Sequence, residues 1–311
     1  MDGILVIWKP RGMTSHDVIF KLRRILKMKK IGHTGTLDPE VDGVLVVCLG
    51  QATKLVEFLM DGGKSYYGEI TLGFSTETED AHGEIVERVP INTVPSEEKI
   101  DQNMQLMEGE ITQIPPYYSA IKVKGRRLYE YAREGIVVER PKRTVHVTSF
   151  KRTSPTYYDL KEQTVSWQFK VECGKGTYVR TLAVDLGKKL GYPSHMSKLT
   201  RTSTGGFNQK DAVTLEDVQS AMDNNTIKEL LYPIERALTE FTSFVLTERQ
   251  FELVRNGQVL ESTFFNNKIK DLTVMIYQNR AIGIYYPHPT KKGYVKPRKM
   301  FQTNIEKGLG E

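Results

Sequence analysis

The stretch KIGHTGTLDPEVDGVLVVCLG, residues 30–50, decides how this chain is interpreted, because three glycines and three acids stand immediately before an apolar run. Asp38 precedes a proline, and Asp42 precedes a glycine. The glycines supply backbone conformations that other residues resist, and Pro39 favours an extended backbone at Asp38. Three interpretations compete for such a loop: an ordinary turn, a metal-binding loop, or a loop that presents a catalytic acid.

The metal-binding interpretation fails on spacing. Three acids followed by Gly43 match the start of a calcium-binding EF-hand loop, whose twelfth residue should be a glutamate. Leu49 occupies that position, and residues 44–48 are apolar. The segments DGGKSY and GKGTYV resemble phosphate-binding loops, but Phe58 and Val179 stand where those motifs require glycine. We therefore expect no bound metal, and neither loop supports a nucleotide cofactor.

The composition indicates a soluble globular protein, since 39% of the 311 residues are hydrophobic and 26% are charged. The longest apolar run, Val44–Leu49, is too short to span a bilayer, and the start, MDGILVIWKP, does not resemble a signal peptide. Cys48 and Cys173 lie far apart in apolar runs, which predicts buried free thiols and a cytoplasmic location. A net charge of +6 makes a polyanion a reasonable partner.

Regular elements are expected on both sides of the loop. We predict a strand over residues 4–8 and a helix over 14–30 that is capped by Thr14 or Ser15. The buried face of this helix is expected to contain Val18, Leu22, Ile25 and the aliphatic part of Lys29. The run at 44–49 is a buried strand or the start of a helix, and a short helix over 54–60 should end at Gly62-Gly63.

Further along the chain, SYYGEITLGF predicts a strand whose period of two puts Tyr66 on the apolar side and Tyr67 on the other. A bulge would exchange the two tyrosines. A helix is expected over 96–108. Residues 165–173 alternate most clearly, with Val165, Trp167, Phe169, Val171 and Cys173 on one face. The turn GKGTY leads into a helix over 179–191, whose apolar face contains Leu182, Ala183, Leu186 and Leu190.

Strands and helices mix without strict strand–helix–strand alternation, which predicts an α+β main domain over residues 1–238. Near residues 239–242 the pattern changes to short strand-like runs that are separated by turns. We therefore expect residues 239–311 to form a small, mostly β domain.

Arg180 stands in the first turn of the helix expected over 179–191, where a cation opposes the helix macrodipole. A carboxylate partner elsewhere in the fold would explain this position. If the partner is Asp38, the ion pair keeps that aspartate ionised and fixes its orientation. The alternative is an arginine on the solvated surface.

The segment IPPYYSAIKVKGRRLYEYAREGIVVERPKR, residues 114–143, contains eight basic residues, three acidic residues and four tyrosines. Cations suit phosphates and aromatic rings suit base stacking, so the pattern favours RNA contact over a solvated loop and helix. A second basic cluster lies near the end of the chain and consists of Lys291, Lys292, Lys296, Arg298 and Lys299.

Several of these segments together are similar to one family. GHTGTLDPEVDGVL, residues 32–45, resembles the catalytic motif of the TruB-type tRNA pseudouridine synthases, and KPRGMTSHDV, residues 9–18, resembles their N-terminal motif. Four later motifs follow in the same order: KSYYGEITLGFSTETEDAHGEI, IPPYYSAIKVKGRRLYEYAREG, CGKGTYVRTLAVDLG and HMSKLTRTSTGGF. The resemblance covers essentially residues 1–240. The last segment resembles a PUA-like RNA-binding domain through GYVKPRKMF.

The resemblance implies a pseudouridine synthase fold, with a mixed, largely antiparallel sheet flanked by helices. It implies an isomerase that converts uridine 55 in the T-arm of tRNA to pseudouridine, without a cofactor, a metal or a guide RNA. We expect the chain to act as a monomer. Two alternatives stay open: a protein that binds and folds tRNA with little or no catalysis, and a synthase for another RNA uridine.

The resemblance also implies roles for individual residues. Asp38 is the essential aspartate, Arg180 pairs with it, and Tyr66 stacks on the target base and is a candidate for proton removal. The residues implied in substrate binding are Lys9, Pro10, His33, Tyr178 and Leu199, with Lys9 and Pro10 supporting the loop. Residues 114–143 correspond to a mobile thumb that clamps the T-loop, through Lys122, Lys124, Arg126, Arg127 and Tyr129. Whether Asp38 attacks the sugar, attacks the base or removes a ribose proton stays open.

Overall fold

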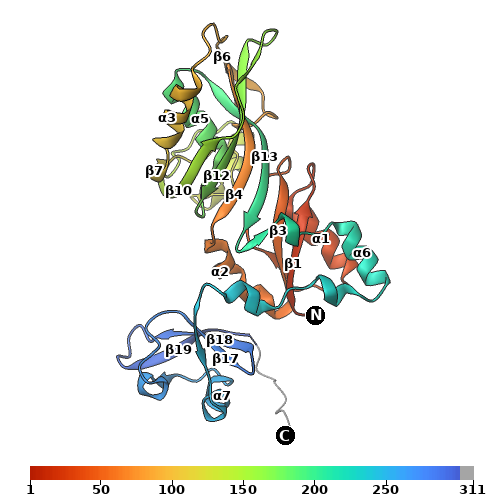
Figure 1. The fold of residues 1–311 in the computed structure, drawn as a ribbon, viewed down its shortest axis with the longest axis vertical. Helices are drawn as coiled ribbons and strands as arrows, with labels where there is room; N and C mark the ends of the chain where they lie inside the picture. Colours follow the sequence, from red (N-terminus) through yellow and green to blue (C-terminus); the bar gives the residue numbers. More distant parts are fainter. Residues whose placement is uncertain (302–311) are drawn as a thin grey trace.

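The computed structural model describes residues 1–301, and the last ten residues of the predicted C-terminal domain lie outside it. The described residues form a large sheet with helices and a smaller separate sheet (Figure 1). The large sheet has ten strands, and its main path runs β1-β3-β13-β4-β12-β10-β7. Neighbouring strands are antiparallel except β3 and β13, which are parallel. The predicted α+β class and largely antiparallel sheet are confirmed.

The strands of this path have the following bounds: β1 Gly3–Lys9, β3 Asp42–Leu49, β13 Ser194–Thr204, β4 Lys64–Leu72, β12 Thr164–Cys173, β10 Arg143–Arg152 and β7 Gly109–Gln113. Three short strands branch from it: β2 Ile31–His33, β11 Tyr157–Asp159 and β14 Phe207–Asn208. Two separate hairpins join β5 Phe74–Thr76 to β6 Ile85–Arg88, and β8 Lys122–Val123 to β9 Arg126–Arg127.

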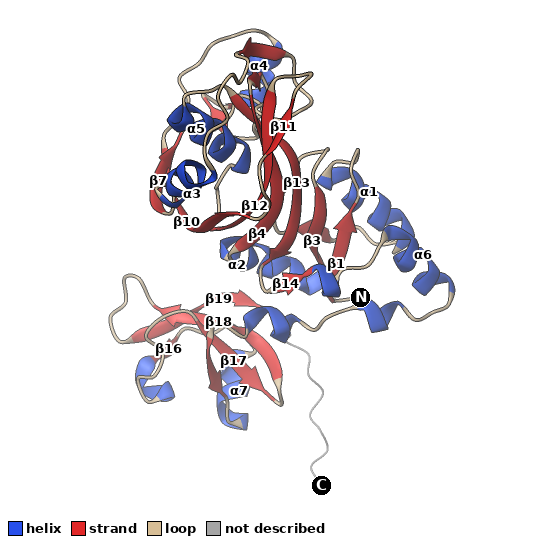
Figure 2. Ribbon diagram, turned by 45° about the horizontal axis from the view of Figure 1, so that its top comes forward, coloured by secondary structure: helices blue, strands red, loops and turns tan. Residues whose placement is uncertain are grey.

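Helices cover the large sheet at both ends (Figure 2). Helices α1, Ser15–Ile25, and α6, Leu215–Asp223, pack against the β1 and β3 end through one apolar cluster. Helices α3, Glu97–Gln105, and α5, Val179–Leu190, cover β10 and β12 through another. The shorter helices are α2 Val56–Asp61, α4 Leu128–Arg133 and the 3₁₀ turns Gly50–Leu55, Gln209–Asp211, Ile227–Leu230 and Ile234–Leu238.

Helix α1 begins as predicted and ends early. Thr14 caps it, since its side chain accepts a hydrogen bond from the Asp17 N–H in a capping box. The helix ends at Ile25 because Lys27 adopts a left-handed φ of 51° and the Met28 N–H bonds back to the Arg23 carbonyl. The expectation that Lys29 lies on the buried face was therefore wrong; Lys29 is exposed and lies beyond the helix.

In strand β4, the residues that face the core are the ones that the sequence predicted. Tyr66 is 7% exposed and faces the core, whereas Tyr67 is 45% exposed. Its pairing with β12 is regular from Lys64 to Leu72, so no bulge exchanges the two tyrosines. The predicted apolar face of β12 is also buried.

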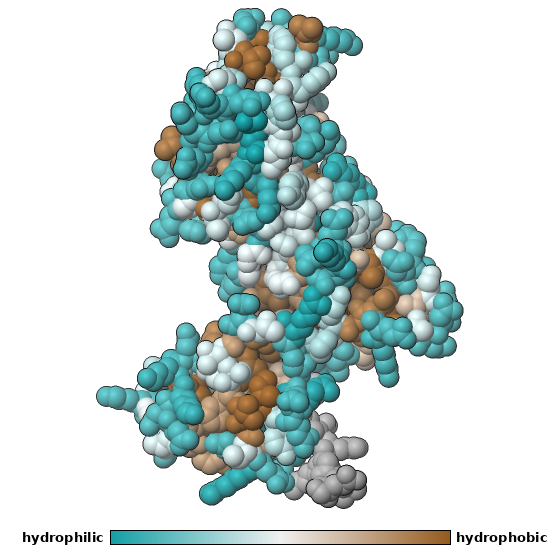
Figure 3. Space-filling model, viewed as in Figure 1, coloured by the Kyte–Doolittle hydropathy of each residue, from teal (hydrophilic) through white to brown (hydrophobic). Residues whose placement is uncertain are grey.

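The smaller sheet has the order β15-β17-β18-β19-β16. Its strands are β15 Thr242–Val245, β17 Thr273–Tyr277, β18 Arg280–Pro287, β19 Tyr294–Met300 and β16 Leu260–Glu261, with helix α7 Glu248–Val254 and the 3₁₀ turn Ser262–Phe265. This sheet is not isolated from the rest, because one apolar cluster joins Val274 and Ile284 to Leu55 and Leu59. Figure 3 shows hydrophobic surface on this smaller domain near the junction.

The two ends of the main domain meet at β1. The backbone N–H and C=O groups of Ile4 both bond to Tyr232, each at 2.8 Å. The other side of β1 pairs with β3 from Gly3 to Lys9. The first strand is therefore held between β3 and a segment more than two hundred residues later.

Both cysteines are buried free thiols, as predicted. Burial raises the pKa of Cys48 to about 12 and that of Cys173 to about 11, so neither thiol ionises readily. In the described part of the chain, no helix is both long enough and apolar enough to cross a membrane.

Candidate active site

The loop at residues 34–41 forms one wall of a pocket of about 320 Å³. The other walls come from β4, β13 and the first turn of α5 with the turn before it. The lining consists of residues 34–38, Val41, Met60, Lys64, Tyr66, Ser119, Ala120, residues 175–180, Leu199 and Arg201. The loop singled out from the sequence thus presents Asp38 to an open pocket with a mixed polar and apolar lining.

Asp38 and Arg180 form an ion pair in this pocket. Oδ2 of Asp38 lies 3.0 Å from Nη2 of Arg180, and the side chains are 42% and 6% exposed, respectively. Arg180 also donates hydrogen bonds to the carbonyl oxygens of Thr78 at 2.8 Å and Tyr118 at 3.0 Å. The carboxylate partner expected for Arg180 is therefore Asp38, and the charge-assisted contact orients the carboxylate.

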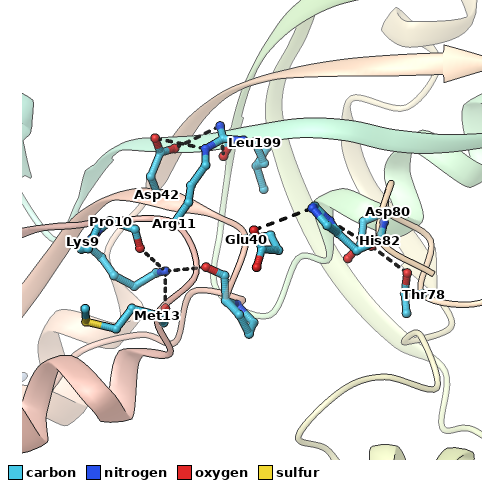
Figure 4. Close-up of polar contacts among 11 residues, drawn as sticks. Lys9, Pro10, Arg11, Met13, Glu40, Asp42, Thr78, Asp80, His82 and Leu199 are labelled. Carbon is cyan, nitrogen blue, oxygen red and sulfur yellow. Dashed lines mark hydrogen bonds and ion pairs between the residues drawn. The ribbon is translucent and has the colours of Figure 1, made fainter.

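Lys9 holds the loop in place (Figure 4). It is fully buried, and its Nζ donates hydrogen bonds to the carbonyl oxygens of Pro10, Met13 and Pro39 at 2.9, 2.5 and 2.9 Å. Burial lowers the pKa of Lys9 to about 8. Lys9 therefore supports the loop through Pro39, and neither Lys9 nor Pro10 lines the pocket, in contrast to Tyr178 and Leu199.

Two further contacts fix the loop. Ser15 Oγ accepts a hydrogen bond from the Leu37 N–H at 2.8 Å and donates one to the Leu37 carbonyl at 3.2 Å, which joins helix α1 to the loop. On another side, Glu40 faces His82 of the β5–β6 hairpin, with 3.7 Å between Oε2 and Nε2 (Figure 4). Hydrogen bonds from β1 and α1 therefore hold the backbone on which Asp38 stands.

Tyr66, Tyr178 and Leu199 line the pocket together with Asp38. Burial raises the pKa of Tyr66 and also that of Tyr178, so both phenols are neutral near pH 7. Two rings and one aliphatic side chain around a carboxylate suit a flat, partly apolar ligand such as a nucleobase.

His33 also lies outside the pocket lining. It ends strand β2 opposite Val47 of β3, and its Nδ1 accepts a hydrogen bond from the Gly35 N–H at 3.3 Å. Burial, together with nearby Arg201, lowers the pKa of the imidazole. In this arrangement His33 supports the beginning of the loop.

Two cations in the pocket were missed from the sequence. Lys64 Nζ donates hydrogen bonds to the carbonyl oxygens of Met60 and Gly62, each at 3.0 Å. Arg201 is 1% exposed and lies directly opposite Tyr66 in the pairing of β13 with β4. The motif HMSKLTRTSTGGF contains Arg201, but polar residues on both faces of this strand hide its alternation.

The segment at 114–143 forms the β8–β9 hairpin and α4, and its basic residues lie apart from the pocket. Lys122, Lys124, Arg126 and Arg127 are exposed. The arginines pack on the segment's own tyrosines: the Arg127 guanidinium lies 5.9 Å from the Tyr129 ring centre, and Arg140 lies 4.3 Å from Tyr117. The beginning of the segment does contact the pocket. Ser119 and Ala120 line it, and the Tyr118 carbonyl accepts a hydrogen bond from Arg180.

Comparisons with known proteins agree on the class. The sequence profile described as "TruB family pseudouridylate synthase (N terminal domain)" matches residues 23–179, and "tRNA pseudouridylate synthase B C-terminal domain" matches residues 180–239. The fold also resembles that of the "Crystal Structure of a Cbf5-Nop10-Gar1 Complex", with a TM-score of 0.74 and 28% identity over 96% of this chain and 85% of that one. The fold and the sequence define a pseudouridylate synthase, which is an isomerase.

Relatives narrow the assignment further. The chain is 47% identical to "tRNA pseudouridine synthase B" of Bacillus licheniformis over 98% of this chain and 99% of the relative. It is 49% identical to the protein of that name from Halalkalibacterium halodurans, over 96% and 97%. The chain belongs to the TruB family.

Proposed function

We propose that this protein converts uridine 55 in the T-arm of tRNA to pseudouridine. The relatives named above are tRNA pseudouridine synthases, which supports tRNA as the substrate. The position within tRNA comes from the motif resemblance. The observation that carries the proposal is the Asp38–Arg180 ion pair in a pocket lined by Tyr66, Tyr178 and Leu199.

The reaction needs a uridine that has left its stack. A base inside the folded T-arm is inaccessible, so it must flip into the pocket at a cost of a few kcal/mol. The N1–C1′ bond then breaks, the uracil turns, and C5 bonds to C1′. Attack on the sugar, attack on the base and removal of a ribose proton all require the oriented carboxylate that Arg180 holds. Tyr66 stacked on the uracil would retain the detached base.

The remaining RNA contacts are assigned to two regions. Residues 114–143 act as a thumb that closes over the T-loop, with Lys122, Lys124, Arg126 and Arg127 on phosphates and Tyr129 on a base. Residues 1–238 form the catalytic domain, and residues 239–311 form a PUA-like RNA-binding domain that carries the second basic cluster. The protein acts as a monomer, without a guide RNA or cofactor.

The experiment that tests this proposal measures tritium release from a tRNA transcript that contains 5-tritiated uridine. Forming the C5–C1′ bond expels the label from C5. Release is expected from the unaltered protein, and neither Asp38→Asn nor a transcript without the T-loop uridine should support it. Tight binding without release would reject the catalytic proposal and favour a tRNA-folding protein. Release that persists without that uridine would identify a different target.

A further inference from the structure

Arg201 is a buried cation that the proposed mechanism leaves unused. Its Nε donates a hydrogen bond to the Val44 carbonyl at 2.8 Å, and its Nη2 donates one to the Gly35 carbonyl at 3.1 Å. Among residues 1–301, no carboxylate forms an ion pair with it. A charge that is buried without a counter-ion is costly, so its retention requires an explanation.

A structural role does not require the charge. These two hydrogen bonds tie the catalytic loop, through Gly35, to strand β3, through Val44. A neutral amide side chain could keep the bond to the Val44 carbonyl without burying an ion, although it is too short to reach the Gly35 carbonyl as well. The positive charge itself therefore points to a partner that becomes negative.

Tyr66 is the acidic group that Arg201 meets. The two residues are directly opposite on β4 and β13, where side chains on one face are neighbours, and both are buried in the lining of the same pocket. Asp38 and Cys173 also act on the phenol. Burial raises the pKa of Tyr66 while Arg201 opposes the rise, so the resting phenol keeps its proton and ionises more easily than it would without Arg201.

Other charged groups near Arg201 do not supply a counter-ion. Lys64, Lys9 and His33 are basic, and Arg201 lowers the pKa of each of them. This side of the pocket is therefore positive and able to stabilise an anion that forms within it.

We propose that Arg201 is the counter-cation of a Tyr66 phenolate that forms and disappears during each isomerisation. This inference rests on the proposed function and assigns Arg201 as a positioning residue that acts through Tyr66.

The step balances in atoms and charge. When the N1–C1′ bond breaks, its electron pair stays on the uracil, and the Asp38 carboxylate balances the positive charge left at C1′. The uracil takes the Tyr66 hydroxyl proton onto N1 and leaves a phenolate beside Arg201. After the ring turns, the C5=C6 electrons form the C5–C1′ bond. The C5–H bond then breaks, its electron pair restores C5=C6, and its proton returns to the phenolate. Hydrogen has moved from C5 to N1, and a label from C5 then exchanges from the hydroxyl group into water.

Single-turnover conversion of tRNA tests this assignment with Arg201→Gln, which keeps neutral donors, and Arg201→Lys, which keeps the charge. We expect Arg201→Gln to be slower by about 100-fold and Arg201→Lys by about tenfold or less. The decisive arm replaces Tyr66 with 3,5-difluorotyrosine, whose phenol is more acidic. This replacement should restore at least about tenfold of the rate in Arg201→Gln, and any gain beside the native arginine should be much smaller.

Two controls separate this role from folding and binding. In a Tyr66→Phe background, Arg201→Gln should cause almost no additional loss, because the two residues act as one unit. The tRNA dissociation constant of Arg201→Gln should stay within about threefold of the unaltered value. If Arg201→Gln does not fold, Arg201→Met, which also removes the charge, carries the same comparison with difluorotyrosine.

Three results would overturn the inference: no rescue by difluorotyrosine, a full additional loss in the Tyr66→Phe background, or a loss of tRNA affinity that accounts for the loss of rate. The last would make Arg201 a phosphate contact. Failure of the unaltered protein to convert tRNA would instead reject the proposed function, and this inference with it.

Discussion

Gly43 is a residue whose identity the geometry dictates. Its φ is 118°, and an added Cβ would lie 2.2 Å from the Arg201 carbonyl oxygen on the neighbouring strand. We expect Gly43→Ala to destabilise the protein by about 4 kcal/mol or more, because backbone atoms cannot move aside cheaply. Gly63→Ala is the matched control, since no atom lies within 4 Å of its Cβ position. Its effect should stay within about 1 kcal/mol. Urea unfolding of both variants checks the contrast, and equal midpoints would contradict it.

Lys9 predicts a dependence of stability on pH. Its pKa is about 8 in the folded protein and 10.5 ordinarily, so between these values the unfolded chain binds more protons. Stability relative to a Lys9→Met variant should therefore rise as the pH increases from about 8 towards 10.5. Below pH 8 lysine is charged in both states, and the cost of burying the charge is constant. The measurement is the difference in unfolding free energy between the two proteins at pH 7.5 and pH 9.5; a flat difference would contradict the assignment.

Among single residues, the sequence identified those whose role is visible from their neighbours in the chain. Asp38 stood out through its loop, and Arg180 through its unfavourable place in the first turn of α5. Arg201 did not, because its importance depends on Tyr66 being opposite it across two strands that are more than a hundred residues apart. Lys9 was expected from its motif to support the loop, and its bond to the Pro39 carbonyl agrees with this. His33 was expected in substrate binding, and only the structure shows that it lies outside the pocket lining and bonds to Gly35.

Helix α1 ends where one residue, Lys27, adopts an unfavourable backbone conformation. Lys27 adopts the left-handed conformation that favours glycine. We expect Lys27→Gly to stabilise the protein by about 0.5 to 1 kcal/mol, which is the relief of strain less the greater entropy of the unfolded chain. Lys21→Gly, in the exposed middle of the same helix, should destabilise it by about 1 kcal/mol. Thermal unfolding of the pair checks the opposite signs, and a shared sign would refute this explanation.

Elements were predictable where one face is apolar and the other polar. Strands β4 and β12 and the start of α1 followed from this contrast. Strand β13 did not, since its sequence SHMSKLTRTST has polar residues on both faces and two register shifts against β4. The early end of α1 was also missed, because a lysine at the left-handed position gives no signal in the sequence.

For the molecule as a whole, the apolar cluster that joins the two sheets predicts cooperative unfolding. Removing residues 239–311 would uncover Leu55, Leu59 and their neighbours, so the fragment 1–238 should unfold at a lower temperature and bind a hydrophobic dye. Glu57→Gln is the control, since it removes only exposed ion pairs to Arg298 and Lys299 and should change stability by less than about 1 kcal/mol. Calorimetry of the full chain should show one transition. Two separate transitions, with an unchanged fragment, would contradict this.

The pairing of Ile4 with Tyr232 also has a consequence for synthesis on the ribosome. The first strand leaves the exit tunnel early, yet one of its edges stays unpaired until the segment around Tyr232 has been translated. At about 5–20 residues per second, that wait lasts on the order of ten seconds or more. During this interval the nascent chain exposes an apolar strand with a free edge, which is a surface that chaperones bind and that can pair with another chain.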